Sequence, residues 1–456
     1  MTGGFSMFRH LVVLTATLML CTSSPWTIRS AQAAESQKPN IVFILSDDHR
    51  WDFLGCAGHP FIKTPNLDRL AGEGIRFKNA FVTTSLCSPS RASFLTGQYA
   101  HTHGVRNNLT PWKGSNVTFL ERLKQAGYDT AFIGKWHMPG NLPSLRGLDT
   151  LVTFTAQGGQ GQYWKCPLIV NGIETPSRKP YITEELTDYA VKFLKKPRKN
   201  PFCLYLSHKA VHHEWLPPPD LRDLYSEVDP RFPEESDAWV TTTRGNIWAG
   251  TFGPLEHHFK NYARCVSALD REIGRILRTL DQLGIAENTM VVYAGDNGYF
   301  WGEHRMVDKR WAYEESIRIP FIVRYPAVIS DPGREADQMV LNIDLAPTLL
   351  EAAGLAVPGE MQGMSLVPIL ESSSAQGRRA WLYEYFKDFP YNVPPILAVR
   401  TETHIYIEYG SRRPSELFDL IKDPREVENL AGSAEADRYR PALKGMLKNL
   451  VATGRP

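Results

Sequence analysis

Two pairs of polar residues follow apolar runs that the sequence predicts to be buried β-strands. Asp47 and Asp48 come after NIVFILS, and Asp296 and Asn297 come after TMVVYAG. Because side chains alternate along a strand, two adjacent residues can face one point only where the strand has ended. The carboxyl ends of parallel strands lie at one edge of a sheet, so these four side chains could meet there. Three carboxylates and an amide oxygen favour Ca²⁺ or Mg²⁺ over zinc, although Asp and Asn are also common turn residues.

A lone cysteine, Cys87, lies in the segment TTSLCSPSRASFLTG. Pro89 is favoured in the first turn of a helix and Ser88 can cap it, so the segment predicts a helix that stops at Gly97. Cys87 would then lie at the positive end of the helix, where anions are stabilised, and Arg91 could reach back to it. The alternative is a capped helix start without any chemical role.

Basic side chains follow the other predicted strands. They are Lys135, His137, His208, His212, His213 and Lys309. Each residue alone could be an ordinary surface residue. Their shared position at strand ends, beside a predicted cation, instead favours a pocket for a multiply charged oxyanion.

The elements that must position these residues alternate between strand and helix along the chain. Predicted strands cover residues 39–48, 130–135, 201–208, 289–298 and 319–326, and predicted helices cover 66–74, 117–128, 185–196, 261–284 and 344–354. This alternation predicts an α/β fold with a mostly parallel sheet and helices on both faces. We expect a catalytic domain over 36–370, a polar linker over 371–379, and an α+β subdomain over 380–456 with antiparallel strands and a terminal helix.

Composition limits the possible partners and compartments. The 456 residues are 43% hydrophobic with a net charge of +2, a balance that gives no sign of a nucleic-acid or anionic-membrane partner. Residues 1–33 resemble a signal peptide, since Arg9 and His10 precede a short apolar run and AQA at 31–33 could be cleaved. We expect export to the periplasm or medium without stable membrane insertion; the alternative is a membrane anchor. Five widely spaced cysteines would then remain, a number and spacing that indicate neither a disulfide scaffold nor a zinc site.

Six motifs together resemble the sulfatases of the alkaline-phosphatase-like superfamily. CSPSRASFLTG matches the family signature Cys-x-Pro-x-Arg. NIVFILSDD, CSPSR, GKWH, GDNG, YEESIRIPFIVRYP and ELFDLIKDPREVENLAG occur in the family's order over most of the mature chain. The resemblance implies that a maturation enzyme recognises the signature and oxidises Cys87 to formylglycine, whose hydrated aldehyde attacks the sulfur of a sulfate ester.

The resemblance also implies a role for each matching residue. The divalent cation, usually calcium in this family, would be bound by Asp47, Asp48, Cys87, Asp296 and Asn297. Lys135 and Lys309 would bind the sulfate oxygens, and Arg91 would hold the hydrated aldehyde. His212 would protonate the leaving oxygen and His137 would help to remove a proton from the second hydroxyl. Val211 replaces a proline common in relatives, which leaves His208 and His213 open as alternatives to His212.

The segments GQYAHTHGVRNN and DKRWAYE are similar to sulfatases that remove the 6-sulfate of N-acetylglucosamine in glycosaminoglycans or mucins. Candidate sugar-binding residues are His101, His103, Arg106, Asn107, Asn108, Glu303, His304 and Arg310. Trp164, Trp215 and Trp301 lie in predicted loops and could stack on sugar rings or pack in the core. Two alternatives remain open: a phosphoester or phosphonate monoester hydrolase of the same superfamily, and a non-catalytic, calcium-stabilised glycan-binding protein.

Overall fold

The computed structural model describes residues 1–4, 38–140, 147–232, 255–410 and 413–454. Residues Lys38–Pro456 form one compact unit, which contains all the helices and strands described below. Of the predicted signal peptide, residues 1–33, only residues 1–4 belong to the described part of the chain. Within the described ranges, no helix combines the length and the apolar character needed to cross a bilayer.

A ten-stranded mixed sheet forms the centre of this unit. Its strands, in spatial order, are β13 (Arg334–Ala336), β2 (Ile75–Phe77), β12 (Phe321–Arg324), β9 (Thr289–Gly295), β1 (Asn40–Ser46), β8 (Phe202–Ser207), β4 (Asp129–Gly134), β5 (Thr150–Thr153), β6 (Leu168–Val170) and β7 (Ile173–Thr175). The five strands from β9 to β5 are mutually parallel, whereas β12 and β6 run in the opposite direction. The predicted α/β class and mostly parallel centre are therefore confirmed.

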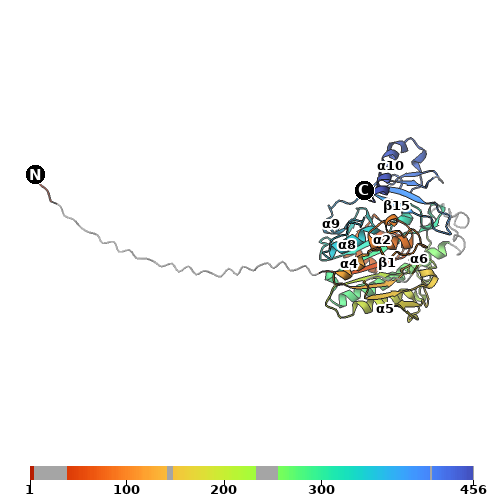
Figure 1. Cartoon of the computed structure of the whole chain (residues 1–456), viewed down its shortest axis with the longest axis horizontal. Helices are drawn as coiled ribbons and strands as arrows, with labels where there is room; N and C mark the ends of the chain where they lie inside the picture. Colours follow the sequence, from red (N-terminus) through yellow and green to blue (C-terminus); the bar gives the residue numbers. More distant parts are fainter. Residues whose placement is uncertain (5–37, 141–146, 233–254, 411–412, 455–456) are drawn as a thin grey trace. The chain divides into compact units, whose positions relative to one another are not determined.

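Both faces of the sheet are covered by helices, as the continuous apolar runs of the central strands predict. Val42 and Ile44 of β1 pack in one hydrophobic core, while Ile41, Phe43 and Leu45 pack in another. The first core contains α1 (Pro65–Gly72), α5 (Ile182–Leu194) and α6 (Leu255–Gln282), and the second contains α2 (Cys87–Thr96), α4 (Phe119–Gln125), α8 (Leu345–Ala352) and α9 (Val367–Glu371). Figure 1 shows α5 and α8 on opposite sides of β1.

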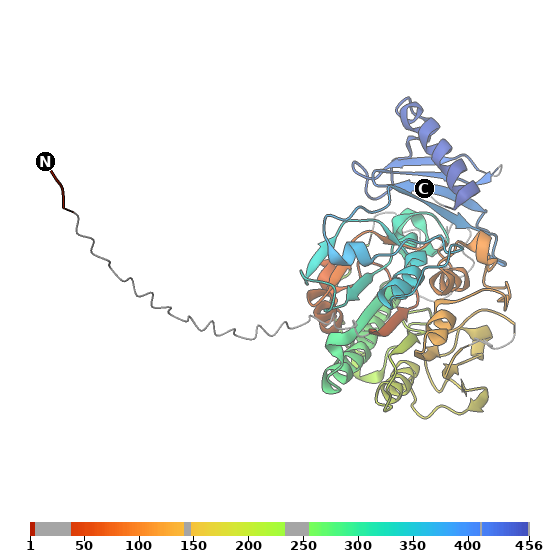
Figure 2. The ribbon, with the colours of Figure 1, turned by 60° about the vertical axis from the view of Figure 1, so that its left-hand side comes forward.

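A second, smaller sheet follows near the C-terminus, as predicted. Its antiparallel strands are β15 (Ala380–Tyr385), β16 (Ile396–Thr401), β17 (His404–Glu408) and β18 (Glu416–Asp419), and the long helix α10 (Ala436–Thr453) packs against them (Figure 2). The sequence analysis missed β18, because its four residues, ELFD, are too short to show an alternating pattern. One hydrophobic core joins this sheet to the main body, with the rings of Trp381 and Phe81 5.1 Å apart.

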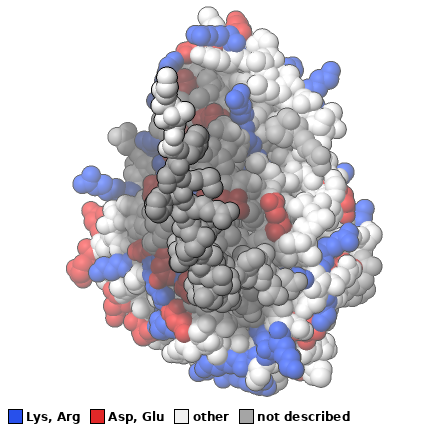
Figure 3. All heavy atoms as spheres, turned by 90° about the vertical axis from the view of Figure 1, so that its left-hand side faces the viewer, with Lys and Arg blue, Asp and Glu red and all other residues white. Residues whose placement is uncertain are grey.

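Short elements occupy the connections. They are β3 (Ala80–Phe81), α3 (Ala100–His103), β10 (Phe300–Trp301), β11 (Val307–Asp308), α7 (Glu314–Ile317), β14 (Val340–Leu341) and the 3₁₀ turns Gly55–Ala57, Ala156–Gly159, Pro219–Leu221, Ala286–Asn288, Glu303–Arg305, Asn342–Asp344 and Leu430–Gly432. On the face drawn in Figure 3, acidic and basic side chains are interspersed, in keeping with the near-zero net charge.

Candidate active site

Four of the five predicted cation ligands, Asp47, Asp48, Asp296 and Asn297, meet at the carboxyl ends of two neighbouring strands. β1 and β9 pair in parallel up to Ser46 and Gly295, so the residues that follow them emerge side by side. The backbone amide of Asp48 donates to Oδ1 of Asp296 (2.9 Å), and Nδ2 of Asn297 donates to Oδ1 of Asp48 (2.7 Å). All four side chains are buried. The prediction that they converge is confirmed.

The chemistry of this cluster fits a hard divalent cation. Burial, and then the negative charge of Asp47, raise the pKa of Asp296 to about 7. Burial also raises the pKa of Asp48. Oδ1 of Asn297 is buried without a hydrogen-bond partner among the described residues. Two carboxylates that resist ionisation, Asp48 and Asp296, lie with the ionised Asp47, whose pKa, despite burial, is lowered by Lys135, and with a free amide oxygen; Ca²⁺ or Mg²⁺ would satisfy this donor set.

Cys87 is the first residue of α2, so it lies at the positive end of that helix as predicted. Its sulfur lies 3.6 Å from Oδ1 of Asp47 and 3.2 Å from Nζ of Lys309. Burial, and then Asp47, raise the pKa of the Cys87 thiol to about 12. An unmodified thiol here would stay protonated at neutral pH and would be a poor nucleophile.

The prediction that Ser88 caps this helix is wrong. The N-cap residue is Leu86, which places Ser88 inside the first turn, where its hydroxyl instead donates to the backbone carbonyl of His137. The predicted end is correct: Gly97 adopts a φ of 67°, a left-handed conformation that glycine accepts readily.

Arg91 connects the two acidic strand ends. Its Nη2 lies 3.1 Å from Oδ2 of Asp47 and 2.8 Å from Oδ2 of Asp296, and its Nη1 donates to the backbone carbonyl of Lys135 (2.9 Å). The guanidinium is 1% exposed. Arg91 therefore supplies a fixed positive charge between two buried carboxylates, whatever further contact it makes with residue 87.

Two lysines flank the cluster. Nζ of Lys135 contacts the carboxylate of Asp47 and donates to Oε1 of Gln160 (2.5 Å). Nζ of Lys309 contacts the carboxylate of Asp48 as well as the sulfur of Cys87. Both ammonium groups thus lie at the acidic cluster, and Lys309 also contacts Cys87 and lines the cavity, as expected for a pocket that binds a sulfate or phosphate group.

The structure separates the three histidines that follow β8. Nδ1 of His212 donates to the backbone carbonyl of His213 (2.7 Å), and its Nε2 lies 3.7 Å from Oδ2 of Asp48. Both His212 and His213 line the cavity described below. His208 is fully buried, away from the lining, and burial lowers its pKa to about 3. Geometry therefore favours His212 over His208, while His137 is buried beside the cavity and does not line it.

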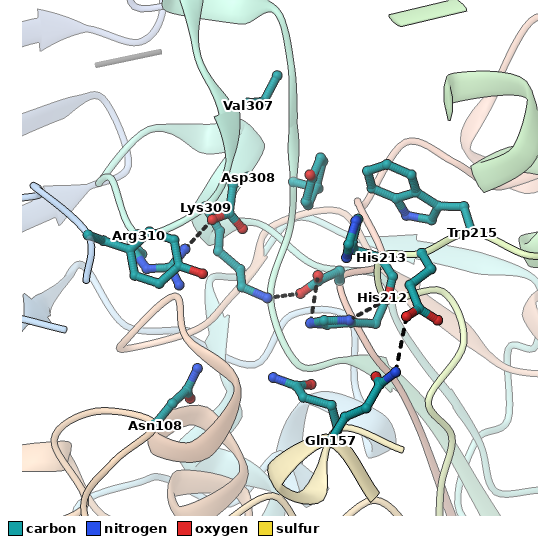
Figure 4. A pocket seen from close by; sticks show the side chains of 14 residues that line it. Asn108, Gln157, His212, His213, Trp215, Val307, Asp308, Lys309 and Arg310 are labelled. Atoms are coloured by element: carbon teal, nitrogen blue, oxygen red, sulfur yellow. Dashed lines mark hydrogen bonds and ion pairs between the residues drawn. The ribbon is translucent and has the colours of Figure 1, made fainter. Parts of the chain in front are cut away.

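A cavity of about 420 Å³ opens above this base (Figure 4). Its lining residues are Asp48, Asn108, Gln157, Gln160, His212, His213, Glu214, Trp215, Tyr299, Val307, Asp308, Lys309, Arg310 and Tyr391. The Arg310 guanidinium lies 3.4 Å from the centre of the Tyr391 ring and 3.3 Å from Oδ2 of Asp388. The volume suits a monosaccharide-sized group, with a charged base and a mixed polar and aromatic rim.

Of the eight predicted sugar-binding residues, Asn108 and Arg310 line this cavity. The others have partners elsewhere: His101 bonds to Glu384, His103 to Ser93, Arg106 stacks on Phe386, Asn107 bonds to the Lys387 carbonyl, Glu303 pairs with Arg50, and His304 stacks on Tyr313. Among the tryptophans, Trp215 lines the cavity and Trp164 packs on Tyr181. Trp301 lies in β10 rather than in a loop and is buried.

Sequence reasoning missed several residues that line or support the rim. They are Gln157, Gln160, Asp308, Asp388 and Tyr391. Asp308 directly precedes Lys309, so that motif could have indicated it. The glutamines belong to the glycine-rich segment AQGGQGQ, and Asp388 and Tyr391 to DFPYN between β15 and β16. The glutamine segment follows only the four-residue strand β5, and the DFPYN segment follows no strand of the parallel centre. Neither segment therefore shows the long apolar run that marked the other site residues.

Comparisons with known proteins cover most of the chain. A family model described as sulfatase matches residues 39–355, and one described as N-sulphoglucosamine sulphohydrolase, C-terminal, matches residues 302–453. The chain is 33% identical to the N-acetylglucosamine-6-O-sulfatase of Bacteroides thetaiotaomicron, over 95% of this chain and 90% of that protein. It is 30% identical to an ulvan-active sulfatase of Formosa agariphila, over 97% and 86% of the two chains.

A solved structure supports the same relationship. The structure of a protein in complex with its substrate, D-glucosamine-2-N,6-O-disulfate, superposes with a TM-score of 0.82 at 31% sequence identity. The match covers 91% of this chain and 97% of the other. The likeness therefore includes both the main sheet and the C-terminal sheet.

Proposed function

We propose that this chain, which belongs to the sulfatase family, hydrolyses sulfate monoesters of carbohydrates, with 6-O-sulfated glucosamine units as its preferred substrates. The observation that carries this proposal is the position of Cys87. Cys87 begins α2 and is buried directly behind the cavity wall, where its sulfur lies 3.2 Å from Nζ of the lining residue Lys309 and 3.6 Å from Oδ1 of Asp47. Named relatives act on N-acetylglucosamine 6-sulfate or carry a 6-sulfated glucosamine as their substrate, which supports the sugar preference.

The residues of this site fit the two groups that the family implies, a divalent cation and a formylglycine. Asp47, Asp48, Asp296 and Asn297 would hold the divalent cation, for which we propose Ca²⁺, and Cys87 would be the residue that the maturation enzyme oxidises to formylglycine. When present, these groups supply positive charge for the sulfate and a nucleophilic oxygen.

The remaining roles belong to side chains already in place. Lys309, whose ammonium group contacts residue 87, and Lys135, whose ammonium group contacts Asp47, would bind sulfate oxygens. His212 would act as an imidazolium, with Nδ1–H donating to the carbonyl of His213 and Nε2–H giving its proton to the leaving alcohol oxygen. Burial, and then the charge of Lys135, lower the pKa of His212, so the negative charge of the bound sulfate would be needed to protonate its ring. Arg310 and Asn108, at the rim, would contact the sugar.

Export and domain limits are also proposals. The charged and apolar pattern of residues 9–33 supports cleavage after an AQA site and export to the periplasm or medium. The polar segment 371–379, between α9 and β15, supports a boundary between a catalytic domain at 36–370 and a C-terminal subdomain at 380–456.

The test combines chemistry at residue 87 with substrate selectivity. The chain is co-expressed with a formylglycine-generating enzyme, and the tryptic peptide from Asn79 to Arg91 is measured by mass spectrometry. Matched 6-sulfate and 6-phosphate esters of N-acetylglucosamine are then assayed. An aldehyde at position 87 with preferential sulfate release supports the proposal. Preferential phosphate release would move the chain to the phosphoester hydrolases, and sugar binding without turnover by matured protein would make it a glycan-binding protein.

A further inference from the structure

A second cluster of metal-ligating side chains lies outside the strand-end site. It contains His304 from the turn after β10, Glu315 from α7 and Glu426 from the loop after β18. The three side chains come from two separate parts of the chain: His304 and Glu315 flank the segment that carries Lys309 and Arg310, and Glu426 belongs to the C-terminal region. One possible ligand atom from each lies within 4.8 Å of the other two.

Each of these residues has a polar atom without a hydrogen-bond partner in the described part of the chain. The atoms are Nε2 of His304, Oε2 of Glu315 and Oε1 of Glu426, and all three are buried. Nε2 of His304 lies 3.4 Å from Oε2 of Glu315. The other carboxylate oxygen of Glu426 accepts from the backbone amide of Glu314 (2.8 Å), which leaves Oε1 free. Glu426 is only 2% exposed, so an unpartnered carboxylate oxygen there is costly.

The nearby arginines form their ion pairs with other acids. The guanidinium of Arg400 pairs with Glu314, and that of Arg50 pairs with Asp52 and Glu303. Within the described residues, neither Glu315 nor Glu426 forms an ion pair with a lysine or an arginine. A buried carboxylate, Glu426, and a half-buried one, Glu315, therefore face one point together with an imidazole, which pairs with Glu315 only when it is protonated.

We propose that His304, Glu315 and Glu426 form a second metal site, which takes a first-row divalent cation such as Zn²⁺. An imidazole nitrogen with two carboxylates is a ligand set of transition metals, whereas Ca²⁺ and Mg²⁺ prefer oxygen donors alone. Water would complete the coordination. This site is independent of the proposed sulfatase chemistry, because none of its ligands contacts Cys87 or the strand-end acids in the structure.

The position of this site gives it a structural consequence. His304 lies five residues before Lys309, and Glu315 lies five residues after Arg310. A metal bound to both, and to Glu426, would fix the two ends of the segment that brings Lys309 and Arg310 to the cavity. It would also tie that segment to the C-terminal region.

The competing explanation is a proton shared between Glu315 and Glu426. Burial, and then the charges of Glu314 and Glu315, raise the pKa of Glu426 well above its usual range, which a proton would satisfy as well as a metal. The two explanations differ in what happens when Zn²⁺ is added at neutral pH: a metal site exchanges the proton for the ion, whereas a purely structural shared proton is retained.

The test compares the wild-type chain with Glu426→Gln, and with Glu428→Gln as a matched control on the exposed side of the same loop. Zn²⁺ is titrated by calorimetry into protein freed of transition metals and kept in saturating Ca²⁺. Thermal unfolding is followed in parallel. The expected result is one equivalent of Zn²⁺ bound to wild type and to Glu428→Gln, with a higher Tm, and binding at least ~10-fold weaker in Glu426→Gln.

Absence of Zn²⁺ binding in wild type, or equal binding by Glu426→Gln, would overturn the proposal and favour the shared proton. Should Glu426→Gln fail to fold, anomalous diffraction at the zinc edge from wild-type crystals decides instead, by showing a peak between these three side chains or none. Neither readout depends on sulfate release, so the outcome is separate from that of the proposed function.

Discussion

The base and the rim of the cavity are built in different ways. The base consists of side chains that directly follow β1, β9 and β4, together with Cys87 and Arg91 of α2 and with Lys309. These side chains are buried and in contact with one another. The rim comes from connections, including the 3₁₀ turn Ala156–Gly159 and the segment between β15 and β16. The difference indicates a division of labour: the base would process any sulfate ester, whereas the rim would choose the sugar.

Replacing Cys87 should have the largest effect. We expect Cys87→Ala to lower kcat/KM by at least roughly 10⁴-fold for every sulfate ester, because it removes the residue from which the nucleophile is made. The measurement is sulfate release from N-acetylglucosamine 6-sulfate and from a small aryl sulfate. Cys203→Ala, a buried cysteine in β8, is the control and should keep its activity. Turnover by Cys87→Ala near the wild-type rate would contradict the assignment of the base.

The next largest effect should come from Arg91, which holds the base together. Arg91→Met leaves Asp47 and Asp296 without their shared guanidinium, and breaking such a buried ion pair costs about 3–5 kcal/mol in the free energy of unfolding. Denaturant unfolding of calcium-free protein measures this loss. Saturating Ca²⁺ should restore part of it, because a cation neutralises the same carboxylates.

The control for this prediction is Arg440→Met. Arg440 forms an exposed pair with Asp437 (3.3 Å), and pairs of this kind contribute at most about 1 kcal/mol. If both variants lost the same free energy of unfolding, the buried ion pairs of Arg91 would stabilise the fold no more than an exposed pair does.

The same contrast explains how far the sequence could predict this site. Asp47, Asp48, Asp296 and Asn297 were predictable because each pair directly follows a long apolar strand, and parallel strands bring their carboxyl ends together. Cys87 was singled out by its place at a predicted helix start and Lys135 and Lys309 by their place after predicted strands, while the family resemblance supplied their roles. Their contacts with the acidic cluster agree with both.

The rim could not be predicted in the same way. Tyr391 and Asp388 reach the cavity because the C-terminal sheet shares a hydrophobic core with the main body, and no local pattern reveals such long-range packing. His103 was chosen from a motif, yet its ring is buried and bonded to Ser93. A motif identifies residues that are close in sequence, whereas the rim is formed by loops that are distant in sequence and are brought together by tertiary packing.

A substitution at the rim should therefore separate substrates. Arg310→Lys keeps the positive charge but loses the planar group that stacks on Tyr391 and reaches Asp388. We expect kcat/KM for N-acetylglucosamine 6-sulfate to fall about 10- to 100-fold, equivalent to roughly 1.4–2.7 kcal/mol. The rate with a small aryl sulfate should change much less.

Arg438→Lys is the matched control, because Arg438 also lies over a tyrosine ring, Tyr439, outside this cavity. It should leave both substrates unaffected. An equal loss on the sugar and the aryl ester in Arg310→Lys would mean that Arg310 belongs functionally to the base, and the division between base and rim would fail at this residue.

The smallest effect should come from Gln157, at the exposed edge of the rim. Its Nε2 donates to Oε1 of Glu214 (3.1 Å), and an exposed hydrogen bond of this kind contributes about 0.5–1 kcal/mol at most. Gln157→Ala should thus change kcat/KM for the sugar sulfate by no more than roughly fivefold. Gln162→Ala, which removes a bond to the Lys165 carbonyl outside the cavity lining, is the comparison. A loss at Gln157 as large as that at Arg310 would show that this edge binds the sugar directly, so that the rim extends to the glycine-rich segment.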